Sequence, residues 1–149
     1  MRSMLDDDDF DLPDDLAALA DAAGAALAGM GEEFAAGAQK DAAAMIEHLR
    51  QAEASPDAQG FSDSVQAAFG IAHDLKGQGG TFGYALVTEL ADHLCALTRP
   101  ANQPSRDNLP RMLAFGQAIY DILAARLEGG GGALGARMRI DLGISQLPC

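Results

Sequence analysis

His73 and Lys76, which precede a run of glycines, are the residues whose types and spacing best suit chemistry. The apolar residues around them recur at helical spacing and predict one buried helix face, formed by Phe61, Val65, Ala68, Phe69, Ala72 and Leu75. His73 lies about 100° from the centre of that face, so we expect an exposed ring with Lys76 one turn along. An imidazole nitrogen can attack a phosphoryl group, and a neighbouring ammonium can offset charge on the phosphoryl oxygens.

Small and polar residues share the predicted side of this helix with His73: Ser62, Gln66, Gly70, Gly77 and Gly80. A glycine inside a helix costs about 1 kcal/mol relative to alanine, so this cluster calls for a compensating role. We interpret it as a flat surface that lets the backbone of another protein approach His73. The candidate docking residues are Gly70, Gly77, Gln78 and Gly80, beside the candidate catalytic residues His73 and Lys76.

The sequence His73-Asp74-Leu75-Lys76-Gly77, followed by Phe82-Gly83, resembles the signature of histidine-containing phosphotransfer (HPt) domains. Thr81-Phe82-Gly83 is especially similar to the phosphoacceptor domain that begins chemotaxis-type histidine kinases. The motif covers about a dozen residues, and the helical pattern extends the likeness over most of residues 14–127. The resemblance implies an all-α, antiparallel four-helix bundle, to which this chain adds an N-terminal helix.

The same resemblance implies a relay in which His73 passes a phosphoryl group between the aspartates of response-regulator receiver domains. Lys76 would assist electrostatically, and a hybrid or separate histidine kinase would supply the phosphate. Any Mg²⁺ would belong to the receiver's acidic pocket, so no cofactor is expected here. The chain shows none of a kinase's motifs, which makes it a phosphocarrier rather than a stand-alone enzyme.

One position departs from the family pattern. Many relatives carry glutamine or glutamate 22 residues after the histidine, where it hydrogen-bonds the ring, and this chain has Cys95 there. Cysteine is a poor acceptor and is expected to be a small core residue. Gln78, Asp92 or His93 could orient the imidazole instead. A second hypothesis is therefore a non-catalytic helical adaptor that binds a receiver or kinase as an inhibitor. A purely structural bundle would leave the glycines unexplained.

Other chemistries fit the sequence poorly. The glycines over residues 77–83 follow a helical pattern rather than a strand, and Asp92 comes too early for a dinucleotide fingerprint. Glu89 and His93 share a helix face but read as a solvated surface pair. His48 reads as a surface histidine, and no metal site is expected.

Composition places the chain among single, alanine-rich helical domains. Its 149 residues are 48% hydrophobic and only 5% aromatic, which favours closely packed helices over sheets. The net charge of −12 argues against nucleic acid and against anionic membrane surfaces. Cys95 and Cys149 offer neither a zinc pattern nor a disulfide framework. With no apolar run suited to a membrane span or signal peptide, we expect a cytoplasmic monomer.

Three segments follow from these patterns: an acidic tail over 1–12, a helical bundle over 13–128, and a Gly-rich linker with a C-terminal tail over 129–149. Helices are expected from Pro13 to the glycines at 29–31, from Glu32 to about Glu53, and over about 61–79, 82–97 and from 105–110 to 127. Residues 133–149 show no clear period and are read as a flexible tail or a strip docked on the bundle.

Overall fold

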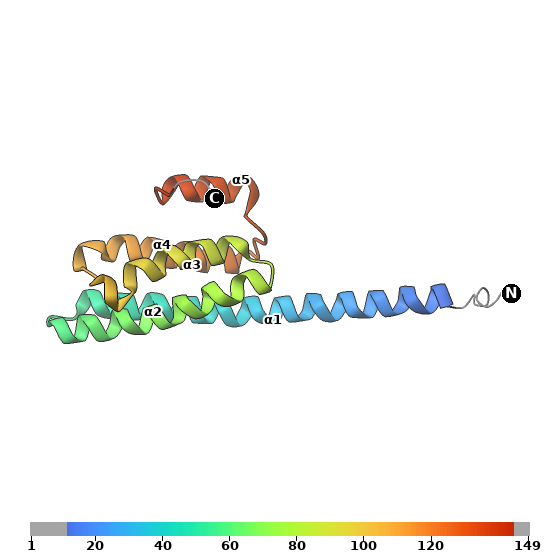
Figure 1. Ribbon diagram of the computed structural model, residues 1–149, viewed down its shortest axis with the longest axis horizontal. Helices are drawn as coiled ribbons and strands as arrows, with labels where there is room; N and C mark the ends of the chain where they lie inside the picture. The colour runs from blue at the N-terminus through green and yellow to red at the C-terminus, as the bar shows by residue number, and fades with distance from the viewer. Residues whose placement is uncertain (1–11, 145–149) are drawn as a thin grey trace. The chain divides into compact units, whose positions relative to one another are not determined.

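In the computed structural model, which describes residues 12–144, the protein is all-helical and that part of the chain contains no strand (Figure 1). The helices are α1 (Leu12–Ala54), α2 (Ala58–Thr81), α3 (Ala85–Thr98), α4 (Leu109–Ala124) and α5 (Gly132–Asp141). Two short 3₁₀ turns, η1 (Pro100–Asn102) and η2 (Arg106–Asn108), connect α3 to α4. The expected all-α class is confirmed. The acidic run over residues 1–11 lies outside the described residues.

Helix α1 corrects the expected boundary at residues 29–31, because it continues through them without a break. Its glycines lower the helix propensity of the segment but do not forbid helical backbone, and the many alanines around them are the best helix formers. Proline, which would end the helix, occurs only at its first turn as Pro13 and beyond its last residue as Pro56. By contact the chain divides into two units, residues 1–34 and 35–149.

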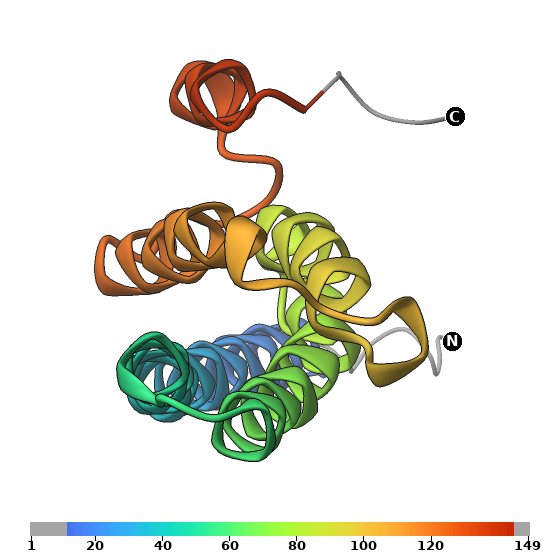
Figure 2. The ribbon, with the colours of Figure 1, turned by 90° about the vertical axis from the view of Figure 1, so that its left-hand side faces the viewer.

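The core of the unit at 35–149 comes from the buried faces of four helices. α2 packs against α3, and α3 against α4 (Figure 2). The part of α1 beyond residue 34 contacts α4, where Gly116 leaves room for Ile46 and where the Gln39 amide donates to the Tyr120 hydroxyl at 3.3 Å. The largest fully buried side chains are Met45, Leu49, Val65, Leu75, Leu86, Leu90, Leu94, Met112, Phe115, Ile119, Ile122 and Leu123.

The turn between α2 and α3 lies two residues later than the expected break at Gly79-Gly80. α2 stays helical to Thr81, and Gly83 then reverses the chain with a φ of +88°, which favours glycine. The Tyr84 amide donates to the Gly79 carbonyl at 2.7 Å, and the Thr88 hydroxyl donates to the Lys76 carbonyl at 2.9 Å. These bonds tie the first turn of α3 to the last turns of α2.

The C-terminal segment contains a helix that periodicity did not predict, since α5 occupies residues read as tail. Two contacts hold this segment to α3, one from the residues that precede α5 and one from α5 itself. The Leu86 amide donates to the Gly129 carbonyl at 2.9 Å, and the Arg139 guanidinium donates to both carboxylate oxygens of Glu89 at 2.7 and 2.8 Å. The docked alternative is therefore the one that the structure supports for residues 129–144. None of the described helices is both long and apolar enough to cross a membrane.

Replacing Arg139 by Met is expected to lower the free energy of unfolding by about 1–2 kcal/mol and to speed amide exchange in α5. Both side chains of the pair are largely buried, at 13% and 15% exposure, so Glu89 would lose its cation in a poorly solvated place. The matched control is Arg137→Met, because the Arg137–Asp141 pair is mostly exposed and should contribute less than about 0.5 kcal/mol. Equal losses in the two variants, by chemical denaturation, would contradict this docking.

Candidate functional site

His73 lies on the exposed side of α2, as its position in the helical pattern predicts. Its neighbours Ala72 and Leu75 are buried in the core, and the imidazole is exposed to solvent. The ring centroid lies 5.9 Å from that of Phe69, with the planes tilted by 48°. Within residues 12–144 the imidazole makes no hydrogen bond to another side chain, so both ring nitrogens are open to an incoming group.

Lys76 lies one turn beyond His73 and reaches across to α3. Its Nζ is 2.9 Å from the Oδ1 of Asp92, and both side chains remain substantially exposed. The hydrogen bond to Asp92 raises the pKa of the Lys76 ammonium above its ordinary value. Asp92 was one of the residues proposed to orient the imidazole. In the structure it binds Lys76 instead.

Phe69 corrects the sequence analysis, because it is only half-buried although the pattern placed it in the core. It lies four residues before His73, and this spacing puts both rings on one side of α2. The Arg99 guanidinium lies over the Phe69 ring at 5.2 Å, and both side chains line a shallow hollow together with Gly70, His73 and Asp74. Sequence reasoning missed Arg99 because the end of α3 had not been placed beside α2.

The glycines around the site fall into two kinds. At Gly70 and Gly77 an added Cβ would meet open space, and both positions are exposed, as is Gln78. At Gly80 the nearest atom would be the Thr88 Oγ1 at 3.6 Å. Gly79 is different, because it is buried and its added Cβ would lie 2.6 Å from the same oxygen. Gly79 therefore serves packing, whereas Gly70 and Gly77 leave the surface beside His73 bare.

The remaining candidates serve structure. Cys95 is fully buried, and burial raises the pKa of its thiol, so it is the small core residue that was expected. His93 stacks on Phe115 with centroids 5.5 Å apart. Glu89 binds Arg139 instead of sharing a site with His93. Among the described residues, no group of three or more His, Cys, Asp and Glu could hold a metal ion.

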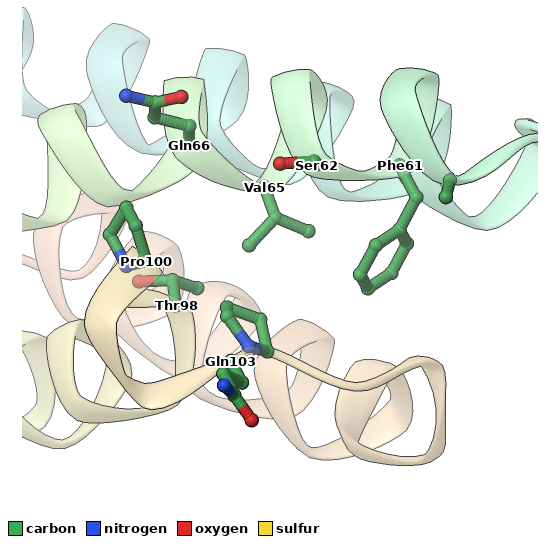
Figure 3. A pocket seen from close by; sticks show the side chains of 9 residues that line it. Phe61, Ser62, Val65, Gln66, Thr98, Pro100 and Gln103 are labelled. Carbon is green, nitrogen blue, oxygen red and sulfur yellow. The ribbon is translucent and has the colours of Figure 1, made fainter.

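A second hollow of about 290 Å³ lies between the first half of α2 and the connection from α3 to α4 (Figure 3). Phe61, Val65, Thr98 and Pro100 are among its lining residues, none of which titrates. The hollow therefore has no general base that could activate the Ser62 or Thr98 hydroxyl, and no fixed charge. Chemistry in the described part of the chain is better supported at His73.

Gly77→Ala and Gly79→Ala should change stability in opposite directions. At Gly77 the methyl group meets nothing within 4 Å, so the gain in helix propensity should raise the free energy of unfolding by up to about 1 kcal/mol. At Gly79 the methyl group collides with Thr88 and lies 3.1 Å from the Tyr84 carbonyl oxygen, so a loss of about 1–3 kcal/mol is expected. Urea denaturation of both variants measures the difference, and a stabilised Gly79→Ala would contradict the close packing described here.

Comparison with known proteins adds no assignment to this geometry. No model of a protein family matches the chain. A search of curated proteins and a search of solved structures likewise return no match. The chemistry of the site is therefore inferred from its own residues: an exposed imidazole, an ammonium one helical turn away, an arginine across a shallow hollow, and a helix surface left open at Gly70 and Gly77.

Proposed function

We propose that the protein is a histidine phosphotransfer protein that relays a phosphoryl group between receiver-domain aspartates through His73. The observation that carries this proposal is the exposed imidazole on a helix surface left open at Gly70 and Gly77, with the Lys76 ammonium one turn away. A solitary surface histidine needs neither feature. A nucleophile that reacts with a group held inside another protein's pocket benefits from both, since the partner's backbone must come close.

In the proposed reaction, a neutral ring nitrogen of His73 attacks the phosphorus of an aspartyl phosphate on a receiver domain. A phosphorus–nitrogen bond forms, the phosphorus–oxygen bond to aspartate breaks, and the carboxylate leaves with the electron pair. The proton on the second ring nitrogen stays there or passes to water. Lys76 and Arg99 supply positive charge beside the phosphoryl oxygens. Transfer onward to a second receiver reverses these steps, and Mg²⁺ belongs to the receiver.

The proposal includes an antiparallel four-helix bundle made of α2, α3, α4 and the part of α1 beyond residue 34. Its support is the packing of α2 on α3 and α3 on α4, together with the contacts between α1 and α4 at Gly116 and Tyr120. In such a bundle His73 lies on the outer side of α2, in the second half of that helix, where a docking domain could reach it. A cytoplasmic, monomeric phosphocarrier that receives phosphate from a histidine kinase through its receiver completes the proposal.

Replacing His73 by Gln should leave the fold intact and abolish labelling by a phosphorylated receiver domain. The side chain is exposed, so the substitution removes the nucleophile without disturbing the core. Radiolabelled receiver is mixed with each variant, and the acid-labile label on this chain is measured after electrophoresis. His48→Gln, which changes a half-exposed histidine on α1, serves as the control and should keep full labelling. Label that persists on His73→Gln would refute the assignment.

Replacing Gly77 by Gln should stop phosphotransfer while the thermal midpoint stays at or above that of the wild type. The side chain has open space around it and glutamine favours helix over glycine, so only the approach of a partner is obstructed. Gly37→Gln offers a matched control, because Gly37 is also an exposed helical glycine with open space but lies on α1. Transfer at the wild-type rate by Gly77→Gln would show that the bare surface has no role in docking.

A second candidate function is a non-catalytic adaptor that binds a receiver or a kinase as an inhibitor. The observation that favours it is the state of the imidazole, which no described side chain orients because Cys95 is buried and Asp92 is bound to Lys76. The same labelling experiment separates the two functions. An adaptor would bind phosphorylated receiver without acquiring label, and His73→Gln would bind as tightly as the wild type.

A further inference from the structure

The hollow between α2 and the connection from α3 to α4 is a feature that the proposed reaction does not use. Its floor is buried, since Phe61, Val65 and Thr98 are 8%, 1% and 0% exposed. Figure 3 shows the Phe61 and Val65 side chains pointing from α2 toward Thr98 and Pro100. An apolar cavity of about 150 Å³ can hold benzene, so this hollow of about 290 Å³ has room for a leucine or phenylalanine side chain. We call it the apolar hollow.

The chemistry of the apolar hollow favours an apolar occupant. None of its lining residues is charged. The buried Thr98 hydroxyl already donates to the Leu94 carbonyl at 2.8 Å, so an apolar group placed over it leaves that donor satisfied. Ser62, Gln66 and Gln103 are exposed and form the edge, where their polar groups can stay in contact with water. A charged occupant would lose its hydration on the buried floor and meet no opposite charge there.

Contacts within the chain hold the walls of the apolar hollow in place. The Arg106 guanidinium lies 4.7 Å from the centre of the Phe61 ring and donates to the Ser55 carbonyl at 2.7 Å. The opposite wall includes Pro100 and Pro104, whose rings fix the backbone φ at two places in this connection. Because the hollow is formed before any partner arrives, filling it requires little loss of conformational entropy.

The position of the apolar hollow beside His73 indicates what fills it. Ser62 and Gln66 precede His73 by 11 and seven residues, which places them within about 20° of it around the helix axis. The rise of α2 puts this edge of the hollow about 10–16 Å from His73. On the opposite wall, Pro100 directly follows Arg99, which lines the hollow that contains His73. The two hollows are therefore neighbours along one side of α2.

A protein domain that docks on His73 would also cover the apolar hollow. A typical interface buries about 800 Å² of each partner, which equals a disc about 16 Å in radius. A disc of that size centred on His73 reaches both Gln66 and Ser62. Binding energy in such interfaces is concentrated in side chains that fill a buried pocket surrounded by a polar edge, and the apolar hollow has this composition.

We propose that the receiver domain that exchanges phosphate with His73 also inserts one apolar side chain, of the size of leucine or phenylalanine, into the apolar hollow. This inference rests on the proposed function, because the docked receiver supplies the side chain. The contact holds the receiver on this side of α2 while its aspartate meets the imidazole. It also contributes to partner choice, since a receiver with a charged residue at the matching position would have to desolvate that charge.

The test compares Ser62→Phe, which places a ring in the apolar hollow, with Ser62→Ala, which leaves it open. Ser62 is exposed, and serine and phenylalanine have similar helix propensities, so the fold should be kept. Transfer from a phosphorylated receiver domain is followed on the full chain over a range of receiver concentrations. Ser62→Phe should raise the concentration that gives the half-maximal rate by about tenfold or more, with the maximal rate changed less than about twofold. Ser62→Ala should stay within about twofold of the wild type in both quantities.

Phosphoramidate, a small phosphoryl donor, separates docking from chemistry at the imidazole. It reaches His73 without a docked domain, so label that is absent from His73→Gln should form equally fast in the wild type and in both Ser62 variants. If phosphoramidate labels His73 but no receiver domain does, the proposed function fails, and this inference fails with it. Gln66→Phe obstructs the other exposed edge of the hollow and should repeat the effect of Ser62→Phe, with circular dichroism as the check on folding.

Four other results would overturn the inference while leaving phosphotransfer itself intact. A wild-type dependence on receiver concentration in Ser62→Phe and Gln66→Phe would remove the apolar hollow from the interface. An equal loss in Ser62→Ala would assign the effect to the hydroxyl group. Slower labelling of Ser62→Phe by phosphoramidate would place the effect on the imidazole. A wild-type dimer in sedimentation velocity, lost in Ser62→Phe, would assign the hollow to a second copy of the chain.

Discussion

The close approach of α2 and α3 at Gly79 is the constraint on which the candidate site depends. Without a Cβ at this position, the Tyr84 carbonyl and the Thr88 side chain can pack against the last turns of α2, and Thr88 can bond the Lys76 carbonyl. This contact fixes the rotation of α2 about its own axis. Once Leu75 and Gly79 face inward, the 100° step of the helix leaves His73 in solvent and places Lys76 where it reaches Asp92 on α3.

The glycines of this region therefore work in opposite ways, although the sequence presents them as one cluster. At Gly79 the space that a Cβ would occupy is already filled by α3, so an added methyl group would collide and the glycine contributes to stability. At Gly70 and Gly77 an added methyl group would meet nothing. These two glycines lower the helix propensity of α2, and no packing contact within the chain compensates for that loss. A role in contact with another molecule would account for that cost, and this is the support for the proposed docking surface.

Periodicity predicted what depends on one helix alone. It gave α2, α3 and α4 to within a few residues and placed His73 in solvent, because the apolar spacing of a helix fixes which side is buried. Periodicity failed where contacts with a neighbouring helix determine the burial of a side chain or the position of an element. Phe69 falls at the edge of the apolar face, and the arginine that covers it comes from the end of α3. Similarly, α5 has no amphipathic pattern, and its position depends on long-range contacts such as the ion pair of Arg139 with Glu89 and the backbone bond between Leu86 and Gly129.

Local propensity misled the analysis at α1 for a related reason. Glycines at 24, 29 and 31 suggested a boundary, but each is a modest penalty spread over a long alanine-rich segment, and only proline would have ended the helix. The sequence interpretation used the net charge of the whole chain, whereas most of the excess of acidic over basic residues lies before residue 35. The net value of −12 therefore describes one end of the molecule far better than it describes the surface around His73.

The pairing of Lys76 with Asp92 has a consequence for the energetics of a relay. The Lys76 ammonium has three N–H donors and could bond a phosphoryl oxygen while it keeps Asp92, but the carboxylate offsets part of the positive charge that the lysine would offer there. Phosphohistidine formed here would gain less from its lysine than it would beside an unpaired one. In the proposed relay the group-transfer potential of phospho-His73 would therefore stay high, which would favour exchange with aspartyl phosphate in either direction.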